Sequence, residues 1–139
     1  ALERFYDEVR RVLKPGGLFA AWSYGVITIE GDEANTLLQH FYHHVVGPYW
    51  PAERHHVETG YRELAFPFQR IEPPARDMQA DWTLKQLAGY LRSWSASARY
   101  AAANGKDAVA ELVTQLRACW GDPNGTRAVR WPLAILAGR

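Results

Sequence analysis

The chain has 139 residues and a formal net charge of +1, with 16 Lys and Arg against 15 Asp and Glu. This balance leaves no basic surplus to neutralise a run of phosphates, so the composition disfavours nucleic-acid binding. Cys119 is the single cysteine, which excludes an internal disulfide and suits a reducing, cytoplasmic location. No apolar run approaches the ~20 residues of a membrane span, so we expect no membrane partner.

An amphipathic helix followed by an apolar strand opens the chain. Residues 2–13 place apolar side chains at helical spacing, and Pro15-Gly16-Gly17 then ends the helix. Residues 18–22 (LFAAW) run apolar without alternation, which is typical of a strand buried on both faces of a parallel sheet. Residues 25–30 extend this strand or form a short strand of their own.

Helical patterns dominate the middle of the chain. An apolar stripe over residues 33–46 predicts a helix with Asp32 as its N-cap, and a weaker stripe over 53–64 is interrupted by Gly60. Residues 65–74 contain three prolines and are expected to form a connection. Residues 76–82 then alternate as a strand does.

The C-terminal third carries the clearest local signals. Thr83 and Gln86 form a capping-box pattern for a helix reaching residue 94, and a short helix over 96–104 ends at Gly105. Asp107 is a good N-cap for the helix that follows, whose stripe extends to residue 120. Residues 126–137 alternate as a final strand. Because Pro132 cannot donate to a ladder, this strand should lie at an edge or carry a bulge.

These residues also resemble a known family. The segment EVRRVLKPGG followed by LFAAW is similar to the region entering the fifth strand of class I S-adenosylmethionine-dependent methyltransferases. Four later segments resemble the methyltransferase type 11, trans-aconitate methyltransferase-like branch. They are Tyr49-Trp50-Pro51, GYRELAFPF at 60–68, GYLRSWSA at 89–96 and the terminal VRWPLAILAGR.

The resemblance implies a fold class and a domain plan. The chain would be the C-terminal part of one methyltransferase domain, an α/β partial Rossmann-like sheet holding only the late strands. Residues 1–30 would supply a helix and a buried strand, residues 31–70 and 83–121 a helical lid, and residues 71–82 and 126–138 the last strands. In that fold the seventh strand is inserted between the fifth and the sixth.

The resemblance also implies an activity for the full-length protein. It would transfer a methyl group from S-adenosylmethionine to a small molecule, in such enzymes often at a carboxylate oxygen. Glycine-rich GxGxxG and P-loop motifs are absent from the sequence. We therefore expect this chain alone to bind no cofactor and to be inactive, with the cofactor site in a missing N-terminal half.

The candidate site residues are aromatic, because methyl transfer to a carboxylate needs alignment and water exclusion more than acid-base groups. Trp22 and Tyr24 follow the first strand at its carboxyl end, where open α/β sheets bind ligands. The lid supplies the other candidates for substrate binding, which are Tyr49, Trp50, Tyr61, Trp94 and Ser95. Ordinary packing in the core or between helices is the alternative for each of them.

Charged and metal-binding candidates are weaker. Arg54 and Arg92 could pair with a substrate carboxylate or remain solvated at the surface. The five histidines lack acidic or cysteine partners at a metal-ligand spacing, and HxxHH at 40–44 lacks the Glu of the zinc motif. The sequence therefore predicts no metal site and no catalytic acid or base.

Two other functions remain open at this stage. The chain could be a non-catalytic module derived from a methyltransferase that self-associates through its uncovered sheet. Its partner would then be a second copy instead of the missing N-terminal half. A helical small-molecule binder would explain the aromatic residues but not LKPGG followed by an apolar strand.

Overall fold

The computed structural model describes residues 2–139 as a mixed α/β structure with an open antiparallel sheet. The strands are β1 (Phe19–Tyr24), β2 (Thr28–Ile29), β3 (Arg70–Ile71), β4 (Asp77–Thr83) and β5 (Thr126–Gly138). The helices are α1 (Leu2–Val12), α2 (Asp32–His40), the π-helix η1 (Phe41–Val45), the 3₁₀ helix η2 (Gly47–Tyr49), α3 (Arg54–Glu58), α4 (Leu84–Arg92), α5 (Ser95–Asn104) and α6 (Ala108–Trp120).

Strand β5 is the centre of the sheet, and every other strand pairs with it in antiparallel orientation. Gly138 faces both Phe19 of β1 and Arg70 of β3, so those two strands flank β5 on opposite sides. Strand β5 thus lies between β1 and β2 on one side and β3 and β4 on the other. Of the two predicted alternatives for the last strand, the edge position is therefore wrong, and an irregularity in the ladder at Pro132 is found.

Pro132 is accommodated at a break in the ladder. Its carbonyl accepts a 2.7 Å hydrogen bond from the Gly25 backbone N–H, on the side where its own missing N–H would have pointed. Tyr24 faces Leu133 and Thr28 faces Arg130, so residues 25–27 lie opposite only residues 131–132. The segment between β1 and β2 therefore has one extra residue and bulges, at the point where Pro132 has no N–H to donate to it.

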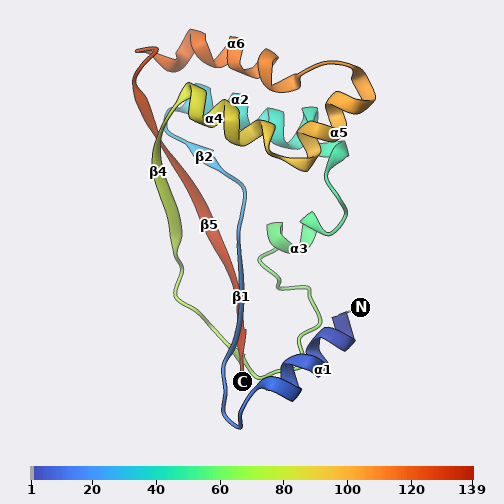
Figure 1. Ribbon diagram of the computed structural model, residues 1–139. Helices are drawn as coiled ribbons and strands as arrows, with labels where there is room; N and C mark the ends of the chain where they lie inside the picture. Colours follow the sequence, from blue (N-terminus) through green and yellow to red (C-terminus); the bar gives the residue numbers. More distant parts are fainter. Residues whose placement is uncertain (1) are drawn as a thin grey trace.

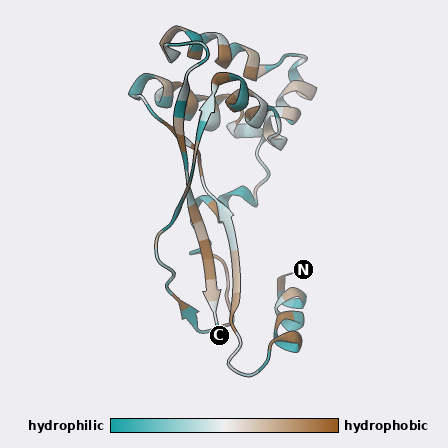
Figure 2. Ribbon diagram, turned by 60° about the vertical axis from the view of Figure 1, so that its left-hand side comes forward, coloured by the Kyte–Doolittle hydropathy of each residue, from teal (hydrophilic) through white to brown (hydrophobic). Residues whose placement is uncertain are grey.

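Strand β1 is not buried on both faces within this chain. Its side chains alternate between half-buried and exposed, and Trp22 is 68% exposed. The prediction of a fully buried strand in a parallel sheet is wrong for residues 2–139, because β1 pairs only with β5 there and one of its faces is uncovered. Figure 2 shows hydrophobic residues along the strands that extend below the helices.

Helices α2, α4, α5 and α6 gather at one end of β5, and α1 lies at the other end (Figure 1). The helical layer buries apolar side chains completely, among them Leu38, Leu87, Leu91 and Leu116. At the opposite end, Tyr6 of α1 packs edge-on against the rings of Phe66 and Phe68. A Cβ on Gly138 would come within 2.5 Å of the Phe66 ring, so β5 ends in a glycine.

Most predicted helices are confirmed, with two corrections. Gly31 and not Asp32 is the N-cap of α2, and no side chain caps this helix. Helix α3 ends at Glu58, several residues before the predicted end, because Gly60 and Tyr61 both have left-handed backbones with φ near 60°. The short strand β3 falls inside the region predicted as a connection.

The caps of α4 and α6 are confirmed. Thr83 and Gln86 exchange the two bonds of a capping box, and the Asp107 carboxylate accepts hydrogen bonds from the Val109 and Ala110 N–H groups. Asp107 also binds Arg92 at 3.0 Å. Partial burial raises the pKa of Asp107, but Arg92 and the two N–H groups outweigh it and hold that pKa below its ordinary value.

We expect Asp107→Ala to lower the free energy of unfolding by about 1 kcal/mol, because both the cap and the Arg92 partner are lost. Asp107→Asn keeps a capping oxygen and should cost less. Since the folded pKa lies below 3.8, the stabilisation by the charge is present above that pH and is lost as the pH falls through the folded value. Urea unfolding against pH measures this. A gap between Asp107→Asn and the parent chain that persists at the lowest pH would contradict it.

Among the helices of residues 2–139, none is both long and apolar enough to span a bilayer.

Candidate functional site

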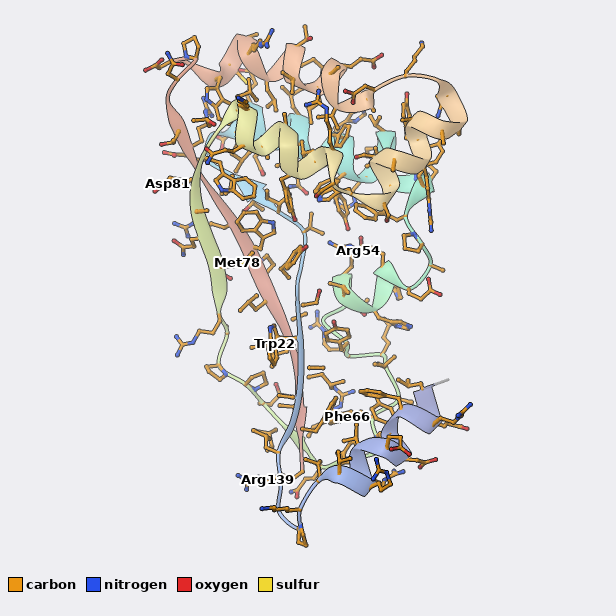
Figure 3. All side chains as sticks on the ribbon, viewed as in Figure 1. Trp22, Arg54, Phe66, Met78, Asp81 and Arg139 are labelled. Atoms are coloured by element: carbon orange, nitrogen blue, oxygen red, sulfur yellow. The ribbon has the colours of Figure 1, made fainter. Side chains whose placement is uncertain are left out.

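The carboxyl end of β1 meets helix α3 at Arg54. Beyond Tyr24 the chain turns at Gly25, whose carbonyl accepts a 3.5 Å hydrogen bond from Nη2 of Arg54. Figure 3 shows Arg54 on α3, below the helical layer. The side chain is partly buried, and its Nη1 group has no hydrogen-bond partner among residues 2–139. A cation with a free donor therefore stands at the carboxyl end of β1.

Arg54 is held by a buried tyrosine. Its Nε donates to the Tyr42 hydroxyl at 2.8 Å, and that hydroxyl donates in turn to Oε1 of Glu58. Arg54 and Glu58 are four residues apart, so α3 presents both on one face. Tyr42 comes from the π-helix η1, in which the Val46 N–H binds the Phe41 carbonyl five residues back. A π-helix and a short α-helix thus build one polar contact.

The environment of Tyr42 favours its neutral form. Burial raises the pKa of Tyr42 most, and the hydrogen bond to Glu58 raises it further, while Arg54 lowers it. The outcome is a pKa of about 12, against an ordinary value of 10.0. Tyr42 is therefore protonated at neutral pH and serves as a fixed link between the arginine and the glutamate.

A group of aromatic side chains surrounds this contact. We call it the aromatic cluster; it consists of Phe41, Tyr42, Trp50, Trp82, Tyr90, Trp94 and Trp131. The Arg54 guanidinium lies 5.1 Å from the Trp50 ring centroid, a cation–π distance. Nε1 of Trp50 is buried without a hydrogen-bond partner among residues 2–139. A buried unpaired donor is unusual in a folded protein.

The structure brings some of the predicted site residues together. The rings of Trp50 and Trp94 pack at a tilt with their centroids 5.3 Å apart, and Trp94 is 9% exposed. Tyr49 instead packs against Tyr100 of α5, and its hydroxyl accepts a hydrogen bond from the Asn104 side chain. The other two lid candidates are Ser95, exposed at the start of α5, and Tyr61, partly buried in the turn after α3.

Trp22 and Tyr24 lie on the uncovered face of β1. They line a shallow cavity of about 480 Å³ together with Met78 and Leu133, and Tyr24 is 43% exposed. Figure 3 shows Trp22 and Met78 on strands that flank β5. Among residues 2–139, neither Trp22 nor Tyr24 forms a ring pair with the aromatic cluster. Burial raises the pKa of Tyr90 in that cluster, and the charge of Tyr24 raises it further.

The remaining candidates lie elsewhere. Arg92 pairs with Asp107 on the helical layer and does not reach β1. The rings of His40 and His44 lie 5.1 Å apart, and His55 binds Glu63 at 2.8 Å. Within residues 2–139, no three His, Cys, Asp or Glu side chains converge as a metal site would require.

Sequence reasoning missed Tyr42, Glu58 and Gly25. The spacing of Arg54 and Glu58 was a usable signal, since residues four apart share a helix face. Tyr42 gave no such signal, because its inward direction depends on the π-helix that replaces the last turn of α2.

The fold and the site together define a class of protein. It is an α/β chain in which the last strand, β5, is central and the helical layer lies at one end of that strand. Arg54 lies at the carboxyl end of the neighbouring strand β1. Models of protein families give no match. A solved structure from Anaeromyxobacter dehalogenans, described as a "Putative Type II Methyltransferase", is similar with a TM-score of 0.90 and 42% identity. The similarity covers 99% of this chain and 58% of that one.

A curated relative agrees. A Dictyostelium discoideum protein named "Putative methyltransferase" is 25% identical over 123 residues, which cover 87% of this chain and 47% of the relative. The chain thus spans about half the length of the proteins it matches. These similarities support a methyltransferase family for the chain.

Proposed function

We propose that this chain forms the acceptor-binding part of a longer S-adenosylmethionine-dependent methyltransferase that acts on a small molecule. The observation that carries the proposal is the similarity to the Anaeromyxobacter protein, at 42% identity over 99% of the chain. The relatives are about twice as long as the chain, which is consistent with further segments in the working enzyme. The proposed fold is the late-strand part of a Rossmann-like sheet, with residues 31–70 and 83–121 as its lid.

Arg54 would bind an anionic group of the methyl acceptor, such as a carboxylate. Its free Nη1 and the unpaired N–H of Trp50 are two donors on stacked groups, and a ligand oxygen would satisfy either of them. Trp50 and Trp94 would form an apolar wall that excludes water. Trp22, Tyr24, Tyr49, Tyr61 and Ser95 stay predictions as acceptor contacts.

The sequence contains no glycine-rich loop of the kind that approaches a nucleotide cofactor closely. We propose that the cofactor binds to segments outside this chain and that these segments, or a second copy, cover Trp22 and Tyr24.

A fusion protein tests this function. The part of the Anaeromyxobacter protein outside the similar region would be joined to this chain, and binding of S-adenosylmethionine would be measured by calorimetry. We expect saturable binding by the fusion and no heat of binding with this chain alone. A folded fusion without cofactor binding, or micromolar binding by the chain alone, would contradict the proposed division of labour.

The acceptor site is tested in the same fusion with a panel of small mono-, di- and tricarboxylates, following release of S-adenosylhomocysteine. We expect Arg54→Gln to reduce kcat/KM for the best acceptor by about tenfold to a hundredfold, with cofactor affinity unchanged. Arg130→Gln, at an exposed arginine of β5, is the matched control. Equal activities of the two variants would remove Arg54 from the site without touching the methyltransferase proposal.

A further inference from the structure

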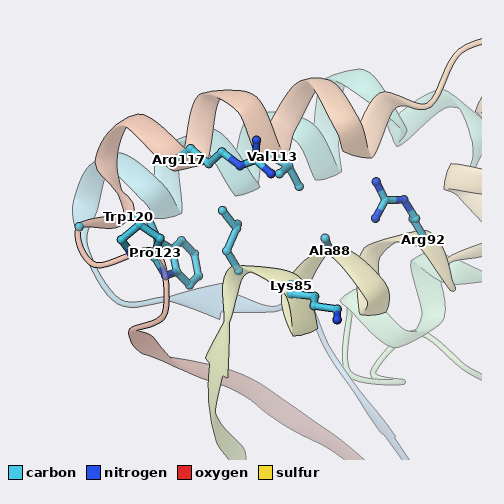
Figure 4. Close-up of a pocket in the computed structure, with 9 residues that line it drawn as sticks. Lys85, Ala88, Arg92, Val113, Arg117, Trp120 and Pro123 are labelled. Carbon is cyan, nitrogen blue, oxygen red and sulfur yellow. The ribbon is translucent and has the colours of Figure 1, made fainter.

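A groove separates helices α4 and α6 on the side of the helical layer away from Arg54. It has a volume of about 570 Å³ and is lined by Leu84, Lys85, Ala88, Arg92, Val113, Arg117, Trp120, Gly121 and Pro123. Figure 4 shows Trp120 and Pro123 closing one end and Arg92 at the other. None of the lining residues belongs to the aromatic cluster, so the groove is separate from the site at the end of β1.

The floor of the groove is apolar. Leu84 and Ala88 lie one turn apart on α4 and are buried, and Trp120 of α6 is 5% exposed. Across from them, Val113 is half-buried. Ala88 is the smallest side chain of the α4 face, and its size leaves space against α6. A volume in this range suits a small organic ligand.

The rim of the groove is positively charged. Three of its nine lining residues are cations, and no acidic residue lines it. Asp107 neutralises Arg92 through the 3.0 Å ion pair. Lys85 and Arg117 have no carboxylate partner within 4 Å among residues 2–139. The groove therefore offers an apolar floor beside two uncompensated cations.

We propose that this groove binds a small amphipathic anion, with an aliphatic or aromatic body and one acidic head group. The body would lie on Ala88, Val113 and Trp120, and the head group would pair with Arg117, whose planar guanidinium matches a carboxylate with two parallel bonds. Lys85 adds a second, point-like attraction. The proposal does not depend on methyltransferase activity, since it uses none of the residues assigned to that site.

Octanoate and its neutral counterpart octanamide, titrated calorimetrically into this chain, test the proposal. We expect octanoate to bind at one site about tenfold more tightly than octanamide, and to weaken as salt is added. Arg117→Gln should weaken octanoate five- to tenfold and leave octanamide unchanged, whereas Arg130→Gln should change neither. Ala88→Leu, which fills the groove, should weaken both ligands.

Four results would overturn the proposal. The first is equal binding of octanoate and octanamide. The second is an equal effect of Arg117→Gln and Arg130→Gln on octanoate binding. The third is loss of octanoate binding in Trp22→Ser, which would place the ligand on the uncovered face of β1. The fourth is a glutamate-rich helical peptide that binds while octanoate does not, which would make the groove a protein-docking surface. Far-UV circular dichroism of each variant confirms that it remains folded.

Discussion

Trp131→Ala should lower the free energy of unfolding of this chain by about 3–5 kcal/mol. Trp131 is 1% exposed on the central strand, and its ring centroid lies 4.9 Å from that of Trp82. Its Nε1 donates a 3.0 Å hydrogen bond to the Tyr90 hydroxyl. The substitution removes the largest side chain where the sheet and the helical layer meet. Urea unfolding followed by far-UV circular dichroism measures the loss.

Two further variants make this expectation specific. Trp131→Phe keeps most of the ring but loses the N–H donor, so it should cost less than the alanine variant, and it remains measurable if Trp131→Ala does not fold. Trp22→Ala removes an equally large side chain that is 68% exposed and should cost less than about 1 kcal/mol. A comparable loss at Trp22 would show that this face is buried in an assembly of the chain.

Local signals in the sequence were sufficient wherever a few neighbouring residues decide the structure. The Thr83 and Gln86 capping box and the Asp107 cap depend on side chains reaching backbone groups two or three residues away, and both are confirmed. The end of α3 was missed for a related reason. Gly60 was noticed, but Tyr61 also takes a left-handed backbone, which its residue type does not indicate.

Long-range pairing was beyond local reasoning. Pro132 suggested an edge strand or a bulge because it lacks an N–H. Strand β5 is central, and the missing donor falls where the neighbouring segment bulges. The resemblance to methyltransferases implied a central position for the last strand. In this chain, the pairing of every other strand with β5 shows it. The candidate site was predicted in part. Trp50, Trp94 and Arg54 meet, but Tyr42 joins them through a π-helix that the apolar stripe does not reveal.

We expect Tyr42→Phe to remove the loss of folding stability that the parent chain shows between pH 10 and about pH 12. The folded pKa of about 12 lies above the ordinary value of 10.0, so the stabilisation by the neutral hydroxyl is complete below pH 10 and is lost as the pH rises to 12. A pKa difference of this size corresponds to about 2–3 kcal/mol of folding free energy. At neutral pH we expect the variant to be about 1 kcal/mol less stable than the parent, because Arg54 and Glu58 lose their shared partner. The two stability curves should therefore cross at alkaline pH.

Single changes at the partners of Tyr42 separate their contributions. Glu58→Gln removes a charge that raises the pKa of Tyr42, so the alkaline loss should become smaller and begin at the same pH. Arg54→Gln removes the group that lowers this pKa, so tyrosinate absorbance should develop at still higher pH. Burial raises the pKa of Tyr90 and Arg54 lowers it, so the Arg54→Gln comparison is made in a Tyr90→Phe background, where only the step of Tyr42 differs. If both variants shift the titration in the same direction, Tyr42 does not connect the two charges, and Arg54 is positioned by the Trp50 ring and the Gly25 carbonyl instead.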